Sequence, residues 1–457
     1  MKYTRTVKAA ALASVVAMAL AACGGGSGNT ADDVKNATLD DSKQVEISFA
    51  GWSLKSTPEF QTLVDAFNKE HPNVKVTIHE YSADDYDTQL TTDLSGGNAP
   101  EVFPIKNLQK YYTYAVDSQG LADLTSIAEG YKNDKNIDIS QYNLDGKYYA
   151  MPYRQDSWIL FYNKTMFEKA GVAVPDGTWT WDDYMKAAEE LKTKLPAAGY
   201  DANSVYPTYH HTSWQSVTQS FTTAQSAATS DGAKKNFLSG DYSYMKDMYN
   251  NVFLKAQDEK LTVDYNTVTS SKVQYQAQFG TEKAAMLPMG SWYAATLVSQ
   301  QKSGDANKFE WGMAPIPQNP NVKSESGKPI TFADPTGLAV SAGATGDKLA
   351  AAVEFVKWAS GEGGAKALAA IATTPAYFSD SVTDTYFGVD GMATDDLTKS
   401  AWQNHDTKPE NPVGEGSDTI ISLLNDAHSS IMTETSSVND ALAKATQDIK
   451  DQGIVTE

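Results

Sequence analysis

The feature that most limits the fold of this chain is a strand–helix–strand pattern between residues 45 and 81. Residues 45–49 alternate apolar and polar side chains, which is typical of a strand with one buried face. Thr57 and Pro58 then offer an N-cap and first-turn pair for a helix with one apolar face. Residues 74–78 repeat the alternation. Strand, helix and strand in this order predict a βαβ unit, and hence an α/β fold with a parallel sheet.

Later segments continue the α/β pattern. Residues 179–191 place acidic side chains early and lysines late, as the helix dipole favours. Short apolar runs at 284–290 and 336–344 predict further strands, and residues 348–358 predict a helix with one buried side. The chain has 457 residues, which is more than one hydrophobic core usually serves. We therefore expect two cores.

The N-terminus has the features of a secretory signal. Basic residues precede an apolar run at 9–20, which is too short for an ordinary transmembrane helix. Residues 20–23 read LAAC and resemble the bacterial lipobox. We predict a lipoprotein signal peptide over residues 1–22 and acylation of Cys23. The alternative is a conventional signal peptide whose cleavage site lies beside a cysteine. Because Cys23 is the one cysteine of the chain, an internal disulfide is excluded.

The segment after the cysteine predicts a flexible tether. Residues 23–42 are rich in Gly, Ser, Asn, Thr and Asp and lack a sustained apolar period. Their glycines follow no strand and precede no Lys-Ser/Thr pair, so they do not indicate a phosphate-binding loop.

The charge of the chain excludes one class of partner. The formal net charge is −20 and the pI is about 4.7, so no basic surface is available for phosphate backbones. A nucleic-acid partner is therefore not expected. No second apolar stretch is long enough to span a membrane, and we expect a folded body outside the bilayer.

Four segments, in order, resemble the extracellular solute-binding proteins of family 1, the maltose-binding-protein type that serves ABC importers. They read FYNKTMFEKAGVAVPDGTWTW at 161–181, EKAAMLPMGSWYAA at 282–295, WGMAPIPQ at 311–318 and TGLAVSAGATGDKLAAAVEFVKW at 336–358. The resemblance implies a two-lobed periplasmic-binding-protein fold of type II, in which each lobe is a sheet flanked by helices and a hinge joins the lobes. By this likeness, lobe one holds residues 43–154 and 320–375, and lobe two holds 155–319 and 376–457.

The same resemblance implies a function. It predicts a sugar-binding lipoprotein that captures an oligosaccharide by hinge closure and delivers it to the permease subunits of an ABC transporter. We expect a monomer without enzymatic activity, metal or cofactor, held on the extracellular face of the cell membrane through Cys23. An anchored receptor suits a cell without an outer membrane, so we expect a Gram-positive host.

A sugar site needs polar groups for hydroxyls and aromatic planes for ring faces. Trp292 follows Gly290 at the end of a predicted strand, where the family places a sugar-stacking tryptophan. Trp292 could instead belong to the core. Asp156 stands where maltose-type relatives carry a hydroxyl-binding acid, although it could instead cap a turn or pair with Arg154. Further candidates follow strands or lie near the expected hinge and cleft: Trp52, Ser53, Lys55, Lys106, Asn107, Arg154, Gln155, Trp214, Asp334, Tyr377 and Trp402.

Other aromatic and histidine residues are assigned to non-binding roles. His210 and His211 lack further spaced ligands, so we expect solvated surface rather than a metal site. Four tryptophans are expected to fill cores: Trp179, Trp181, Trp311 and Trp358.

Two other functions remain open. A surface glycosidase would use similar aromatic and acidic residues, but it needs two carboxyl groups at a set separation. No GxSxG, HExxH, P-loop or cysteine nucleophile is present. A polyamine receptor of the same fold would share the acid-plus-aromatic pattern.

Overall fold

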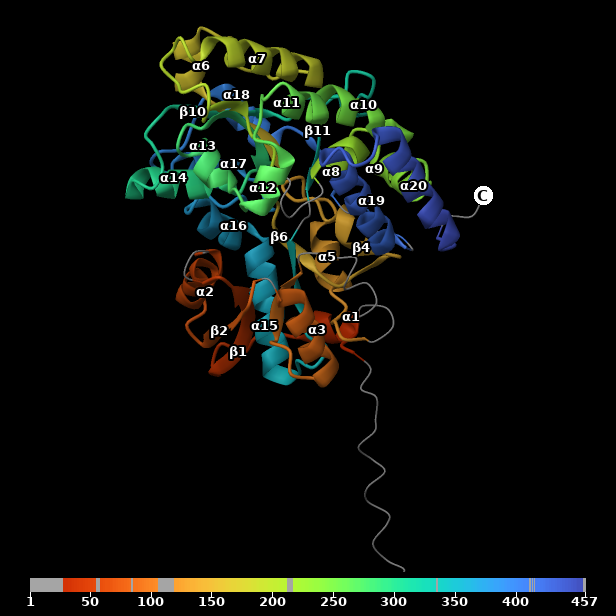
Figure 1. Cartoon of the computed structure of the whole chain (residues 1–457). Helices are drawn as coiled ribbons and strands as arrows, with labels where there is room; N and C mark the ends of the chain where they lie inside the picture. Colours follow the sequence, from red (N-terminus) through yellow and green to blue (C-terminus); the bar gives the residue numbers. More distant parts are fainter. Residues whose placement is uncertain are drawn as a thin grey trace, which may run out of the picture.

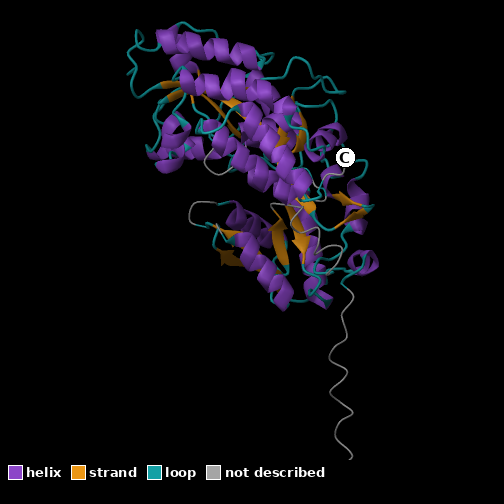
Figure 2. Cartoon of the chain, turned by 45° about the vertical axis from the view of Figure 1, so that its right-hand side comes forward, coloured by secondary structure: helices purple, strands orange, loops and turns teal. Residues whose placement is uncertain are grey.

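The protein folds as two bodies around two separate hydrophobic cores. The structure is a computed structural model that describes residues 28–54, 58–83, 85–105, 119–211, 217–333, 336–410, 412, 414 and 416–454. We call the body whose core includes Phe49 and Phe355 lobe one, and the body whose core includes Trp158 and Leu287 lobe two. Figures 1 and 2 show lobe one below lobe two, with β6 (Met151–Arg154) where they meet. The predicted two-lobed α/β architecture is confirmed.

Lobe one contains a five-stranded sheet in the order β2-β1-β3-β12-β6. Its first pair is parallel, with register from Val45↔Val74 to Trp52↔Tyr81. The connecting helix α2 (Glu59–Glu70) buries its apolar face, so the predicted βαβ unit is confirmed. Strand β12 runs antiparallel to β3 and β6 and makes the sheet mixed. The strands are β1 (Val45–Trp52), β2 (Val74–Tyr81), β3 (Val102–Ile105) and β12 (Thr336–Val340).

The helices of lobe one include one that was not expected. Besides α2, they are α1 (Ala31–Asn36), α3 (Tyr86–Gly96), α5 (Thr125–Tyr131) and α15 (Gly346–Ser360), with a small hairpin of β4 (Asn143–Leu144) and β5 (Lys147–Tyr148). Helix α1 falls in the segment predicted to be a flexible tether. Thr30 and Asp33 form a capping box at its start, and Val34 is 1% exposed in the core of lobe one. Residues 28–36 therefore belong to the folded body.

Lobe two contains a four-stranded sheet in the order β10-β7-β9-β8. Strands β10 and β9 run antiparallel to β7, and β8 is parallel to β9. All seven residues of β9 are buried. The strands are β7 (Trp158–Asn163), β8 (Tyr206–Thr208), β9 (Ala284–Gly290) and β10 (Trp311–Pro315).

Many helices cover the sheet of lobe two (Figure 1). Thr180 and Asp183 form a capping box for α7, and Trp181 begins the helix inside the core. Trp311 and Trp358 are also buried, and Trp179 packs half-buried on the core of lobe two, as expected. The helices are α6 (Lys164–Ala170), α7 (Trp181–Lys194), α8 (Val217–Ala224), α9 (Ser230–Leu238), α10 (Lys246–Met248), a π-helical turn (Tyr249–Leu254), α11 (Lys255–Asp258), α12 (Tyr265–Ser270), α13 (Tyr275–Phe279), α14 (Tyr293–Ser303), α17 (Asp380–Phe387), α18 (Asp396–Gln403), α19 (Ser417–Met432) and α20 (Val438–Asp451).

The chain passes between the lobes at three places. The first crossing runs from β6 to β7 through residues 155–157, and the second runs from β11 (Ile330–Ala333) to β12. The third follows α16 (Glu362–Ala369) and leads to α17. Strand β11 pairs with β13 (Asp406–Pro409), and its Phe332 lies in the core of lobe two. The 320–375 segment expected in lobe one is thus divided between the lobes, because β11, near its start, packs against β7 and α8 of lobe two.

Candidate functional site

The structure covers about half of the predicted binding residues. Asp156, Arg154, Gln155, Trp52, Trp292, Tyr377 and Trp402 are described. Cys23, Lys55, Lys106, Asn107, Trp214 and Asp334 lie outside the described residues.

Asp156 lies at the middle of the first crossing and is 6% exposed. The Ser291 hydroxyl donates a hydrogen bond of 2.9 Å to its Oδ1. Its Oδ2 lies 2.7 Å from Arg154 Nε, yet no described residue donates an aligned hydrogen bond to this oxygen. This oxygen is covered in this conformation, and it keeps lone pairs that can accept a hydrogen bond from a hydroxyl group once the surrounding groups move apart.

A chain of buried hydrogen bonds leads from Asp156 to the third crossing. Ser291 Oγ receives a hydrogen bond from the Ser157 amide at 3.2 Å and one from Thr374 Oγ1 at 3.1 Å. Trp402 Nε1 donates to Thr374 Oγ1 at 3.1 Å. Residues of the first and third crossings, together with Ser291 just before α14, therefore hold the Asp156 carboxylate.

Trp402 was predicted to contact ligand, and the structure places it among the residues that line a cavity beside Gln155, with most of its ring packed in the core of lobe two. Its side chain is 1% exposed and stacks on Tyr386 with ring centroids 4.1 Å apart. Phe378 and Phe387 pack against its edges. The indole therefore belongs to the core of lobe two and acts on the site through Thr374.

Trp292 lies beside this carboxylate and is half-buried. It follows Ser291, the partner of Asp156, and its ring packs edge-on against Trp158 with centroids 5.6 Å apart. Its Nε1 donates to Tyr275 Oη at 3.3 Å. Gly290 allows this placement, because a Cβ there would come within 1.9 Å of the indole.

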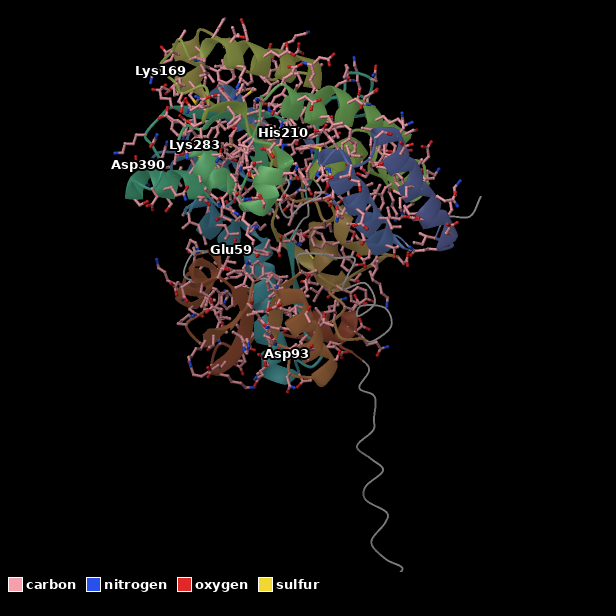
Figure 3. The ribbon with its side chains drawn as sticks, viewed as in Figure 1. Glu59, Asp93, Lys169, His210, Lys283 and Asp390 are labelled. Carbon is pink, nitrogen blue, oxygen red and sulfur yellow. The ribbon has the colours of Figure 1, made fainter. Side chains whose placement is uncertain are left out.

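Tyr275 and His211 complete an aromatic wall next to Trp292. Their rings pack edge-to-face with centroids 5.1 Å apart, and both residues are buried. Burial raises the pKa of Tyr275 and lowers the pKa values of His210 and His211 to about 3 and about 4. The histidines were expected on the solvated surface, and the structure corrects this. His210 Nε2 instead lies 2.9 Å from the Tyr184 hydroxyl inside lobe two (Figure 3).

Arg154 connects Asp156 to lobe one. Its Nη1 contacts Glu59 Oε2, and Glu59 is the first residue of α2. The side chain of Arg154 is 21% exposed, and that of Glu59 is 3% exposed. Burial by itself lowers the pKa of Arg154, but the two carboxylates outweigh it and raise this pKa above its usual value. Figure 3 places Glu59 near the level where the lobes meet.

Trp52 lies at the end of β1, as predicted, and is 9% exposed. Its ring packs edge-on against Phe60 and Tyr86, with centroids 4.6 and 4.7 Å away. The ring is thus mainly a packing element of lobe one beside the start of α2. Ser53, the next residue, has a φ of 50°, so the backbone turns sharply after the strand.

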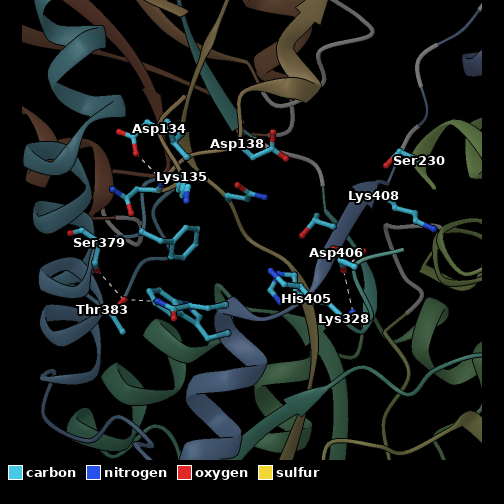
Figure 4. A pocket seen from close by; sticks show the side chains of 18 of the residues that line it. Asp134, Lys135, Asp138, Ser230, Lys328, Ser379, Thr383, His405, Asp406 and Lys408 are labelled. Carbon is cyan, nitrogen blue, oxygen red and sulfur yellow. Dashed lines mark hydrogen bonds between the residues drawn. The ribbon is translucent and has the colours of Figure 1, made fainter. Parts of the chain in front are cut away.

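Gln155 and Tyr377 lie apart from the Asp156 cluster. Gln155 lines a cavity of about 1080 Å³ together with residues 134–138 of lobe one and with Trp402 and Lys408 of lobe two. Figure 4 shows charged residues of both signs around this cavity. Tyr377 lies nearby, and its hydroxyl accepts a hydrogen bond of 3.1 Å from Asn136 Nδ2. Asp156, Ser291 and Trp292 do not line this cavity, so we place the candidate site at the cluster.

The cluster combines the chemistry that a polyhydroxylated ligand needs. A buried acceptor oxygen stands beside a half-exposed indole and a tyrosine, and polar residues of both lobes meet there. The arrangement does not suit a metal, since no group of three His, Cys, Asp or Glu in the described part of the chain could hold one.

Sequence reasoning missed Glu59, Tyr275, Ser291 and Thr374. Ser291 directly precedes Trp292, so the strand-end argument that found Trp292 could have found it too. Glu59 carries only the signal of an acidic residue in the first turn of a helix, which usually indicates dipole stabilisation. Nothing local distinguishes Tyr275 or Thr374.

Comparison with known proteins identifies a matching family. The sequence profile described as "Bacterial extracellular solute-binding protein" matches residues 51–366. The chain is 26% identical over 371 residues to the multiple sugar-binding protein of Streptococcus mutans, covering 78% of this chain and 79% of that protein. It is also 26% identical over 240 residues to the melibiose/raffinose/stachyose-binding protein MelE of Bacillus subtilis. This match covers 50% of this chain and only 52% of MelE.

Solved structures support the same conclusion for the fold. A sugar transporter protein from Rhizobium etli, solved in an open conformation, superimposes with a TM-score of 0.74 at 30% sequence identity. The match covers 89% of this chain and 99% of that protein. The two-lobed architecture is therefore shared along nearly the whole of that relative.

Proposed function

Because the chain belongs to the bacterial extracellular solute-binding proteins, a family of binding proteins that work with ABC transporters, we propose that its solute is an oligosaccharide. The observation that carries this proposal is the buried carboxylate of Asp156, whose Oδ2 pairs with Arg154 Nε but receives no aligned hydrogen bond from a described residue, together with the half-buried indole of Trp292. A sugar hydroxyl can donate to this oxygen while a sugar ring face covers the indole. The relatives named for melibiose, raffinose and stachyose or for multiple sugars support the same ligand class.

Hinge closure explains how binding is signalled. Asp156 and Arg154 lie on a crossing, Trp292 lies on lobe two, and Glu59 lies on lobe one. A ligand that contacts both lobes stabilises the conformation in which they approach each other, because it gains contacts there that it lacks in the open state. The closed, loaded receptor is then the form that a permease would accept.

Lipid anchoring completes the proposal. Cys23 lies in a lipobox-like sequence, and the described part of the structure begins at Gly28, whose amide donates to Gln119 Oε1 at 3.2 Å. In the described residues, no helix is both long and apolar enough to cross a bilayer. We therefore place the body outside the membrane, attached through acyl chains on Cys23.

A glycosidase remains the alternative from another class. The two carboxylates nearest the site, Glu59 and Asp156, both pair with Arg154. A glycosidase needs two carboxyl groups that face the scissile bond, whereas both of these are held by one guanidinium. The geometry thus suits binding better than hydrolysis.

A thermal-shift panel tests the ligand class. Melibiose, raffinose and stachyose are compared with spermidine as a cationic control. A ligand that binds only the folded state at 100 times its Kd adds about 2.7 kcal/mol to the free energy of unfolding, so the melting temperature rises. We expect at least one oligosaccharide to raise it and spermidine to leave it unchanged. A rise with spermidine alone would assign the site to polyamines, and sugar fragments on chromatography would indicate a glycosidase.

A further inference from the structure

Arginine is nearly absent from this protein. Among 37 basic residues, the sequence contains two arginines, Arg5 and Arg154, and Arg5 lies outside the described residues. Every other basic residue is lysine. Arginine differs from lysine in having a planar guanidinium fork that can bind two acceptors at once. An arginine in a chain that otherwise uses lysine therefore suggests that this fork is needed at its position.

The fork of Arg154 reaches two carboxylates that belong to different parts of the molecule. Nη1 contacts Glu59 at the start of α2 in lobe one, and Nε lies 2.7 Å from Asp156, two residues before β7 of lobe two. The Tyr153 hydroxyl donates to Glu59 Oε1 at 3.2 Å. The side chains of both carboxylates are less than one-tenth exposed, so water screens these ion pairs little.

The backbone of Arg154 stands where all three crossings meet. It pairs with Thr336 of the second crossing and forms a bridge with Pro375 of the third. The neighbouring amide of Gln155 donates to the Thr374 carbonyl at 3.3 Å. Arg154 therefore lies where the three connections between the lobes are joined by backbone contacts, and its side chain holds a group on each side.

We propose that Arg154 is a positioning residue that links the ligand-binding carboxylate of Asp156 to Glu59 of lobe one. The inference rests on the proposed function, in which a ligand hydroxyl donates to Asp156 Oδ2. Ser291 fixes the other oxygen, so the carboxylate responds to ligand mainly at the side that faces Arg154. Ligand binding at Asp156 Oδ2 shifts the Arg154 guanidinium between Asp156 and Glu59. This shift changes how strongly the hinge is attached to α2.

Raffinose titration calorimetry with four single variants and one double variant tests the link. Arg154→Lys keeps the charge without the fork, Arg154→Gln removes both, and Glu59→Gln removes the lobe-one partner without touching ligand. The control Lys164→Gln breaks another half-buried ion pair, to Asp395 in lobe two. We expect both Arg154 variants to weaken binding about tenfold or more, and Glu59→Gln to weaken it severalfold. The double variant Glu59→Gln/Arg154→Gln should bind no more weakly than Arg154→Gln, and the control should match wild type.

Several outcomes would overturn the proposal. Wild-type affinity in Arg154→Lys shows that the fork is not needed. A lower melting temperature with unchanged affinity in Glu59→Gln shows that the pair is only structural. If raffinose, melibiose and stachyose all fail to bind wild type, the proposed sugar ligand fails, and small-angle scattering of the ligand-free protein decides the hinge link. An identical radius of gyration in Arg154→Gln and wild type then rejects the proposed hinge link as well.

Discussion

Trp292 occupies a place that is set by its immediate neighbours. Gly290 leaves space for the ring, Trp158 supports its edge, and Tyr275 accepts a hydrogen bond from its indole nitrogen. These contacts hold the ring in one orientation and leave it half-buried, so it can act as a rigid plane for a ligand. A ring that is already oriented loses little entropy on binding.

Replacing Trp292 with alanine should weaken oligosaccharide binding by at least about 1.4 kcal/mol, or tenfold, because the stacking plane is lost. Calorimetry with the sugar identified by the thermal-shift panel measures this directly. Trp179→Ala is the matched control, since Trp179 is also half-buried on lobe two but precedes α7 rather than α14. The control should lose stability without losing affinity, and equal affinities for both variants would remove Trp292 from the site.

Helix α1 shows how an element too short to be stable alone is held in place. It has six residues, so its stability comes from packing and capping rather than from helix propensity. The side-chain amide of Asn29 donates to the carbonyl oxygens of Ala342 and Ala344, at 3.3 and 2.7 Å. Together with buried Val34, these contacts dock the N-terminal segment against lobe one.

Val34→Asp should release α1 from lobe one, because an unpaired charge would otherwise be buried at a cost of about 3 kcal/mol or more. Limited proteolysis followed by mass spectrometry should then show cleavage within residues 24–44. Val174→Asp places the same charge on a side chain that is 43% exposed and should cleave like wild type. Protection of α1 in Val34→Asp would show that the capping box and Asn29 suffice.

At the scale of the whole molecule, three buried histidines make the fold sensitive to acid. Burial lowers the pKa of His210 to about 3, and of His211 and His428 to about 4. Above pH 6.5 each imidazole is neutral in both the folded and the unfolded state. Below pH 6.5 the unfolded chain binds protons that the folded chain does not, so the free energy of unfolding falls until the pH reaches the folded pKa.

Each of these histidines should remove about 2 kcal/mol of stability between pH 7 and pH 5, a range in which few carboxylates titrate. Denaturant unfolding at both pH values measures the loss. His428→Gln should reduce the loss by about 2 kcal/mol, because glutamine does not titrate. His79→Gln, at an exposed position on β2, is the control and should change nothing. Equal losses in wild type and His428→Gln would contradict the assignment.

Local sequence patterns determined the elements of the two lobes. The alternation at 45–49 and 74–78 and the apolar run at 284–290 formed strands as predicted, and the helix predicted at 179–191 formed at 181–194. These signals work because side-chain period and capping act between residues that are close in the chain. The same logic found Trp292 at the end of a strand. It failed at α1, whose polar composition concealed a single buried valine.

Only the tertiary structure decided which side chains meet. Ser291 contacts Asp156 across 135 residues of chain, and Arg154 contacts Glu59 across 95. The spacing of apolar and polar residues along the sequence does not predict such pairings, since they depend on how the crossings bring the two lobes together. The same holds for the two histidines that look solvated in a polar stretch yet lie buried. The sequence alone thus determined the fold class, because its signals are local, and long-range packing decided which side chains surround the carboxylate of the proposed site.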